Sequence, residues 1–371
     1  MRNVLLLLFS AHETNEGDKM IKKDGLFLFF FRLFASFAIK YVFLISDRMK
    51  RLLLLVLWVW VACFTAASHN YMFKHLEVKD GLSNNQVNAI YKDSHGFMWF
   101  GTASGLNRYD GYDTRIYRSL KDDGNSLPDS YIEDIQEDAT GNLWVRTGAG
   151  YAIYNSVSDI FDRNVEGWMW HIGISGNPST VYIDSEKIFW IYVAGKGIYC
   201  YKPGQENAVM VAGTDTLLTE MNITDMTECS EGILLAFGNG VLACLDREKL
   251  NVKWTFDGIA SQWGKNQSET FTLFVDSHER VWMYSVEGMW VYHLPKKSWE
   301  VRSVRSDRSN MVRAISQDKY GNIWIGRDQD GIEVIGLDGE SVRLMNDPNN
   351  ERTISNNTVT VLYEDNVGTM W

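Results

Sequence analysis

The sequence has few cysteines and no excess of basic residues. Of its four cysteines only Cys200, Cys229 and Cys244 follow the apolar N-terminal stretch, and an odd number does not make a disulfide framework. The formal net charge is −11. It becomes −15 without residues 1–68, because the remainder holds 27 Lys and Arg against 42 Asp and Glu. An acidic chain argues against binding to a phosphate backbone, so no nucleic-acid partner is expected.

Other patterns are missing too. The seven histidines show no metal-ligand spacing, and His95 and His278 occupy equivalent turn positions, so no metal and no cofactor is expected. From His69 onward no apolar run is long enough to span a bilayer. The chain lacks the 3.6-residue periodicity of a helical solenoid, and its repeat is too long for a β-helix.

The N-terminal residues read as leader sequence rather than as folded structure. Residues 1–48 are interpreted as a mis-assigned start or as an extra apolar segment, and a membrane segment there is the alternative. Residues 49–68 have a basic beginning, an apolar core and small residues before His69, which is typical of a signal peptide. Residues 69–371 are therefore predicted to be the exported domain.

The strongest positive signal is a repeat that opens at an Asp and places a Trp six residues later. In the first copy Asp93 begins a turn and Trp99 follows. Successive anchors are 42 to 47 residues apart, and such a fixed period indicates an array of similar units. A degenerate copy begins at Cys229, with Leu235 in the Trp place. The anchors are Trp99, Trp144, Trp190, Leu235, Trp282, Trp324 and Trp371.

Each unit contains four short strand signals separated by turns. In the first, 87–93 alternates apolar and polar residues, and Asp93 and Gly96 suit a type I turn. Four antiparallel strands in about 45 residues predict the blade of a β-propeller. The Trp side chains are interpreted as structural fillers between blades, each with an indole N–H that needs one partner.

The fold class is thus predicted to be an all-β propeller of about seven four-stranded blades, the last incomplete. A seventh unit begins at Ile354, and a lone strand at 71–77 is expected to complete it. The chain is interpreted as the front portion of a longer protein or as a truncated reading frame. The six complete blades are predicted at about 82–120, 127–165, 178–212, 222–256, 268–304 and 311–345.

The repeat resembles a known family. Residues 83–111, SNNQVNAIYKDSHGFMWFGTASGLNRYDG, are similar to the two-component regulator propeller repeat, and residues 321–326 and 355–359 match it again. The resemblance covers about residues 71–371.

This resemblance implies the periplasmic sensor region of a hybrid two-component histidine kinase that takes part in a phosphorelay. The full-length protein would be an inner-membrane histidine kinase and a homodimer, and its ligand an oligosaccharide or another small periplasmic molecule. This chain itself is expected to be no enzyme, with no catalytic residues.

Candidate ligand contacts lie in loops between second and third strands and between blades, which cluster on one face of a propeller. Arg146 and Arg327 are interpreted as replacing the small residue that follows the Trp-x pair of the first copy, and Arg suits carboxylate or sulfate. The alternative for each residue is an ordinary solvated polar side chain. The candidates are Asn84, Asn85, Arg146, Lys196, Asn239, Arg327 and Asp328.

Two other functions remain open. A freestanding secreted propeller could act as a protein-binding scaffold. A polysaccharide lyase or glycosidase would need paired acid and base groups in one pocket. The Asp and Glu residues sit mostly at turn positions of the repeat, which explains them without chemistry.

Overall fold

The computed structural model describes residues 71–371, apart from 215–221, 260–268, 305–310 and 366. The chain divides into two compact units, Met1–Tyr71 and Met72–Trp371, and the second contains almost all described residues. The predictions for residues 1–48 and 49–68 lie outside the described residues. In the described ranges no helix has the length and apolar character needed to cross a membrane.

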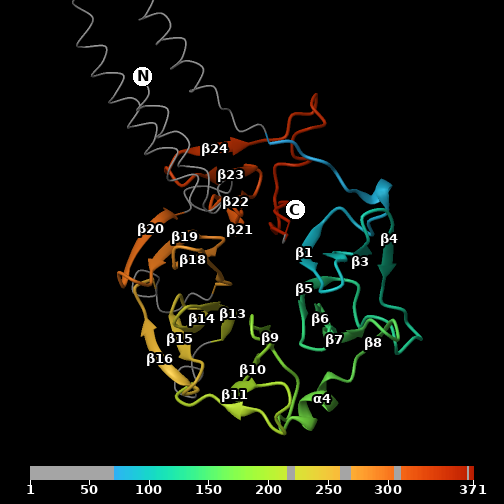
Figure 1. Ribbon diagram of the computed structural model, residues 1–371, viewed down its shortest axis with the longest axis vertical. Helices are drawn as coiled ribbons and strands as arrows, with labels where there is room; N and C mark the ends of the chain where they lie inside the picture. Colours follow the sequence, from blue (N-terminus) through green and yellow to red (C-terminus); the bar gives the residue numbers. More distant parts are fainter. Residues whose placement is uncertain (1–70, 215–221, 260–268, 305–310, 366) are drawn as a thin grey trace, which may run out of the picture. The chain divides into compact units, whose positions relative to one another are not determined.

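The unit Met72–Trp371 consists of antiparallel four-stranded sheets, in each of which the strands pair in chain order. The prediction of an all-β propeller with four-stranded blades is confirmed. In Figure 1 the blades follow one another along the chain from blue-green to red. The first three are blade one, β1 (Val87–Lys92), β2 (Met98–Thr102), β3 (Gly105–Tyr109) and β4 (Thr114–Tyr117); blade two, β5 (Ile132–Glu137), β6 (Leu143–Thr147), β7 (Gly150–Asn155) and β8 (Ile160–Asp162); and blade three, β9 (Thr180–Ile183), β10 (Phe189–Val193), β11 (Gly197–Tyr201) and β12 (Val209–Met210).

Three further blades have the same strand order, and every sheet lies inside its predicted range. They are blade four, β13 (Ile223–Cys229), β14 (Gly232–Phe237), β15 (Leu242–Asp246) and β16 (Asn251–Phe256); blade five, β17 (Thr272–Val275), β18 (Arg280–Ser285), β19 (Gly288–His293) and β20 (Ser298–Val304); and blade six, β21 (Val312–Gln317), β22 (Ile323–Arg327), β23 (Ile332–Ile335) and β24 (Ser341–Leu344).

The prediction of about seven blades is wrong, because the described residues form six. Residues 354–371 contain a single bridge, Glu364↔Met370, instead of a four-stranded sheet. The predicted strand at 71–77 is also absent from the described residues. A backbone bond from Phe73 N to the Arg352 carbonyl, 3.1 Å long, joins this segment to the chain after blade six. A short 3-10 helix, η3 (Val78–Asp80), follows the segment.

The hydrophobic core lies mainly between blades rather than inside one sheet. One buried cluster joins Trp99 of blade one to Leu143 and Val145 of blade two, and further clusters join each following pair of blades. At the remaining boundary Phe100 of blade one packs against Trp371, with 5.5 Å between ring centroids. The segment 354–371 therefore occupies the position between blades six and one.

Each anchor Trp is held by the Asp six residues before it. In blade one the indole Nε1 of Trp99 donates to Asp93 Oδ2 at 2.7 Å. The other carboxylate oxygen accepts the amides of His95 at 3.0 Å and Phe97 at 2.9 Å. One Asp thus fixes both its turn and the next strand's Trp. The same Asp–indole bond joins Asp138–Trp144, Asp184–Trp190, Asp276–Trp282, Asp318–Trp324 and Asp365–Trp371.

Blade four departs from this arrangement, and the sequence alignment there was wrong by one residue. Leu234, not Leu235, occupies the register of Trp99 and faces blade five. The shift arises because the turn after Cys229 is shorter than the turn in the other blades. Trp254 of β16 packs into the same core instead. Cys229 and the other two described cysteines, Cys200 and Cys244, are free thiols.

Two features were not predicted. A short helix, α4 (Val165–His171), follows blade two, and its Trp168 packs edge-on against Trp144 with centroids 4.6 Å apart. After β12 the chain also forms a parallel bridge between Ala212 and Asn251, at the edge of blade four. This bridge connects the outer strands of blades three and four.

Candidate functional site

The seven predicted contact residues lie at one end of the blades. The first strand of a blade begins beside the place where the second ends, as the pair Val87↔Thr102 shows in blade one. Loops that enter a blade therefore share an end with the turns between second and third strands. Of the candidates, Asn84 and Asn85 precede β1, Arg146 lies in β6, Lys196 follows β10, Asn239 follows β14, Arg327 ends β22 and Asp328 follows it.

The two asparagines before β1 organise their own loop. Asn84 donates from Nδ2 to Ser104 Oγ at 3.0 Å, and its Oδ1 accepts the Gln86 amide at 2.8 Å. Asn85 Oδ1 accepts the amide of Val78 at 2.9 Å. These bonds connect the entry loop to the neighbouring turn and to η3, so both amides have a structural use.

The two candidates in the turns of blades three and four are also engaged locally. Lys196 is exposed, and its Nζ donates to the carbonyl and the hydroxyl of Ser175, both at 2.7 Å. Asn239 Oδ1 accepts the Val241 amide at 3.1 Å within its turn. Lys196 is therefore more accessible than Arg146 and Arg327, the other two cationic candidates.

Arg146 takes the register of Gly101, as predicted, since it opposes Asp134 where Gly101 opposes Ala89. Its Nε lies 2.7 Å from Glu133 Oε2. Glu133 is the extra residue of a bulge in β5, which turns its side chain out of the ladder. The Arg146 side chain keeps 37% of its surface exposed, so it can still meet a ligand.

Arg327 does not replace Gly101, contrary to the prediction. Gly326 has that register, and Arg327 stands where the first copy has Thr102. Arg327 is buried and forms an ion pair with Glu333 Oε2 at 2.5 Å. It therefore stabilises blade six and is not presented to a ligand.

Asp328 joins blade six to the segment after it. Its Oδ2 accepts a bond from Arg313 at 2.9 Å, and its Oδ1 accepts one from Thr358 at 3.0 Å. The bond from the Arg313 guanidinium holds the pKa of this carboxyl below its usual range. The seven candidates thus share one end of the blades, but each bonds mainly within its own blade or to an adjoining segment of the chain.

Sequence reasoning missed an acidic residue on an innermost strand. Asp225 of β13 accepts the amides of Met226 and Leu273, both at 2.8 Å. Desolvation, with a smaller contribution from the charge of Asp134, raises the pKa of Asp225 to about 7, although the bonds from the two amides act to lower it. Its position in the repeat could have revealed it, because Asp225 occupies the place in blade four that the apolar Ala89 occupies in blade one.

Comparison with protein families gives a match that covers part of the chain. The family described as two component regulator propeller matches residues 81–104, 126–149 and 306–326. A curated relative, histidine kinase P4 of Formosa agariphila, is 40% identical over 62 residues, which is 17% of this chain and 4% of that kinase.

Solved structures share the fold at low sequence identity. Two extracellular domains assigned to hybrid two component systems of B. thetaiotaomicron superpose with TM-scores of 0.62 and 0.61 at 18% and 17% identity. Each alignment covers 81% of this chain, which spans only 40% and 38% of those domains. Streptogramin B lyase superposes with a TM-score of 0.51 at 10% identity, over 78% of this chain and 91% of the lyase. Such likenesses show the propeller fold alone.

Proposed function

The chain carries repeats of the two-component regulator propeller family, and from that premise we propose that residues 69–371 form an extracytoplasmic ligand-sensing propeller. It would be the N-terminal portion of a hybrid two-component sensor histidine kinase in a phosphorelay. The family match is the observation that carries this proposal. The fold shared with extracellular domains of hybrid two component systems supports it.

The proposed ligand is an oligosaccharide that binds at the end of the blades where the seven candidates lie. Sugar hydroxyls both donate and accept hydrogen bonds, and Lys196 and Arg146 offer partly exposed donors there. A ligand that prefers one arrangement of the sensor would shift the population of a homodimeric kinase toward that arrangement. Buried Arg327 has no contact role in this proposal.

An exported location belongs to the same proposal. The apolar residues 52–64 after a basic start fit a signal peptide, and two of the solved neighbours are extracellular domains. The propeller would then lie in the periplasm, with the full-length protein anchored in the inner membrane.

Binding of oligosaccharides tests the ligand. The chain is titrated calorimetrically with a panel of neutral and acidic oligosaccharides. A member that binds should bind several-fold more weakly to Lys196→Ala. Lys202→Ala is the matched control, because Lys202 is exposed and follows β11 at the opposite end of the same blade. No binding across the panel, or equal effects of both variants, would contradict the proposal.

The genomic reading frame tests the kinase portion separately. We expect the frame to continue past the codon for Trp371 into more repeats, a membrane helix and a kinase. A stop codon with no such sequence beyond it would leave a freestanding propeller.

A further inference from the structure

The space beside the anchor Trp of blade five is filled differently from the space in blade one. Trp99 packs against Tyr117, with centroids 5.9 Å apart, and against Tyr154 at 5.1 Å. Among the described residues, no aromatic ring pairs in this way with Trp282. A boundary that is closed by tyrosines in blade one is therefore open beside blade five.

Two guanidinium groups take the place of the rings. The Arg280 and Arg302 guanidinium carbons lie 5.3 and 5.9 Å from the ring centroid of Trp282. Arg280 also pairs with Asp276 at 2.6 Å, and the Arg302 Nε lies 3.8 Å from a Glu300 oxygen. Stacking on an aromatic ring positions a guanidinium and leaves its N–H edge available.

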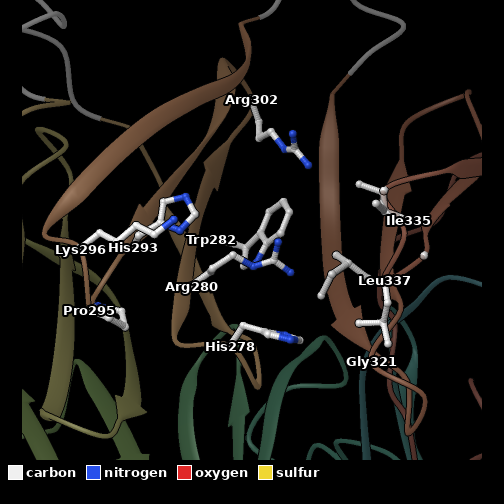
Figure 2. A pocket seen from close by; sticks show the side chains of 13 residues that line it. His278, Arg280, Trp282, His293, Pro295, Lys296, Arg302, Gly321, Ile335 and Leu337 are labelled. Atoms are coloured by element: carbon white, nitrogen blue, oxygen red, sulfur yellow. The ribbon is translucent and has the colours of Figure 1, made fainter. Parts of the chain in front are cut away.

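The open space is a cavity of about 390 Å³ between blades five and six, within the size range of small-molecule sites. Blade six supplies an apolar wall of Ile323, Ile335 and Leu337. We call this cavity the blade 5–6 pocket. Figure 2 shows Arg302, Arg280 and His278 on the blade five side of the space, and Ile335, Leu337 and Gly321 on the blade six side.

The charge of the pocket is opposite to that of the chain. Its described lining residues include His278, Arg280, His293, Lys296 and Arg302 and no Asp or Glu, although the chain carries a net charge of −11. Within the described ranges neither His293 nor Lys296 forms an ion pair with a carboxylate. A cleft lined by one sign of charge focuses the field and concentrates ions of the opposite sign.

We propose that the blade 5–6 pocket binds a small organic anion, with its oxyanion group against Arg302, Arg280 and Lys296 and its apolar body against Leu337 and the other apolar residues. Arginine N–H groups match the geometry of carboxylate and phosphate oxygens.

The pocket is lined by turns that join first to second and third to fourth strands. It therefore lies at the opposite end of the blades from the proposed oligosaccharide contacts, and does not depend on that function.

Probes that share one apolar ring test the proposal. Benzoate, phenyl phosphate and neutral benzyl alcohol are titrated against the chain by ligand-observed NMR at low and high salt. At least one anion should bind about tenfold tighter than the alcohol, which corresponds to about one charge-assisted hydrogen bond. Its binding should weaken with salt. A preference for phenyl phosphate would identify a phosphoryl ligand, and a preference for benzoate a carboxylate.

Variants locate the binding. The double variant Arg302→Gln/Lys296→Gln should lose about tenfold in affinity for the anion. Arg343→Gln is the matched control. Arg343 also lies on a fourth strand, pairs with Asp330 and has a side chain 45% exposed, against 40% for Arg302. The control should bind like the wild type.

A second variant distinguishes loss of anion binding from loss of the folded structure. Leu337 is 58% exposed, so Leu337→Glu should keep the thermal unfolding midpoint while placing a negative charge in the pocket. Anion binding should fall much further in this variant than in Leu337→Gln, which loses the same apolar contact but adds no charge. Equal binding of both anions and benzyl alcohol to the wild type, or equal losses in the Arg343 control and the double variant, would overturn the proposal.

Discussion

In every repeat except the degenerate copy in blade four, a single carboxylate performs two tasks because it has two oxygens. In blade one, Asp93 uses Oδ1 for turn amides and Oδ2 for the indole of Trp99. The sequence predicted both that the Asp would serve its own turn and that the indole would need a partner. It did not predict that the two needs are met by the same side chain, because that requires the three-dimensional closeness of turn and strand.

Removing this carboxylate should destabilise the protein. We expect Asp93→Ala to lower the free energy of unfolding by about 2–4 kcal/mol, because a buried indole N–H and two amides lose their acceptor. Urea denaturation measures the change. Asp93→Asn keeps one acceptor oxygen, so its free energy of unfolding should lie between those of the wild type and Asp93→Ala. A loss below about 0.5 kcal/mol for Asp93→Ala would contradict this role.

Asp225 should make stability depend on pH. Its folded pKa is raised to about 7, whereas an Asp in an unfolded chain ionises near pH 4. Between these values the folded state holds the extra proton, so the free energy of unfolding falls as the pH rises toward 7 and levels off above it. Below pH 4 both states are protonated and this contribution is fully present.

The variant Asp225→Asn should lack this dependence. Between pH 5 and pH 8 the wild type should lose about 1–3 kcal/mol more than Asp225→Asn, as measured by urea unfolding at both pH values. Other titrating groups are common to both proteins and cancel in the comparison. Parallel pH profiles for the two proteins would show that the carboxyl titrates normally.

At the scale of elements, neighbouring blades are linked by a repeated polar contact beside the Asp. Glu137 of blade two accepts the Ser94 amide at 3.0 Å and the Ser94 hydroxyl at 2.6 Å from blade one. Gln317 of blade six likewise accepts the Ser277 amide at 2.8 Å. The link therefore needs an acceptor oxygen and not a charge.

Two variants of Glu137 test whether the contact needs an acceptor oxygen or a negative charge. Glu137 is 5% exposed, and Glu137→Ala should cost about 1–3 kcal/mol by leaving Ser94 without its acceptor. Glu137→Gln should cost less, because blade six already uses Gln in this place. Chemical denaturation of both variants measures the difference, and equal costs would show that the charge matters instead.

The strand pattern of the blades was predictable from the sequence, and the exceptions have physical reasons. Alternating residues and Asp and Gly turns mark the four strands locally, so blade positions follow from short windows. Helix α4 was missed because its seven residues are too few for a helical period to be visible. The bulge at Glu133 was missed because register depends on pairing between strands. The position of Arg327 could be read from the sequence, because Gly326 follows the Trp324–Ile325 pair and Arg327 comes one residue later.

At the scale of the whole unit, the first and last described segments meet beside blade one. Thr360 Oγ1 donates to the Val87 carbonyl at 2.5 Å, and the Lys92 amide donates to the Tyr363 hydroxyl at 3.3 Å. Trp371 packs on Phe100 of the same blade. The expectation of a seventh, incomplete blade completed by a strand at 71–77 failed here, since a first-strand pattern does not show whether a sheet will form.

This boundary should open first when its aromatic contact is removed. Trp371→Ala should lower stability by about 1–3 kcal/mol and speed hydrogen exchange of β1 amides more than that of β13 amides. Trp170→Ala is the control, because Trp170 is 73% exposed on α4 and should change neither. Uniform acceleration across all blades would contradict a local opening.

The parallel bridge between Ala212 and Asn251 has a mechanical consequence. Blades three and four are joined by their buried cluster and also at their outer edges, through the Ala212 amide bonded to the Leu250 carbonyl at 2.8 Å. Two sheets fastened at both the inner and outer margins resist twisting against each other better than sheets fastened at one. Blades three and four are thus expected to move as one rigid body, and strain in the ring would be taken up at the other boundaries.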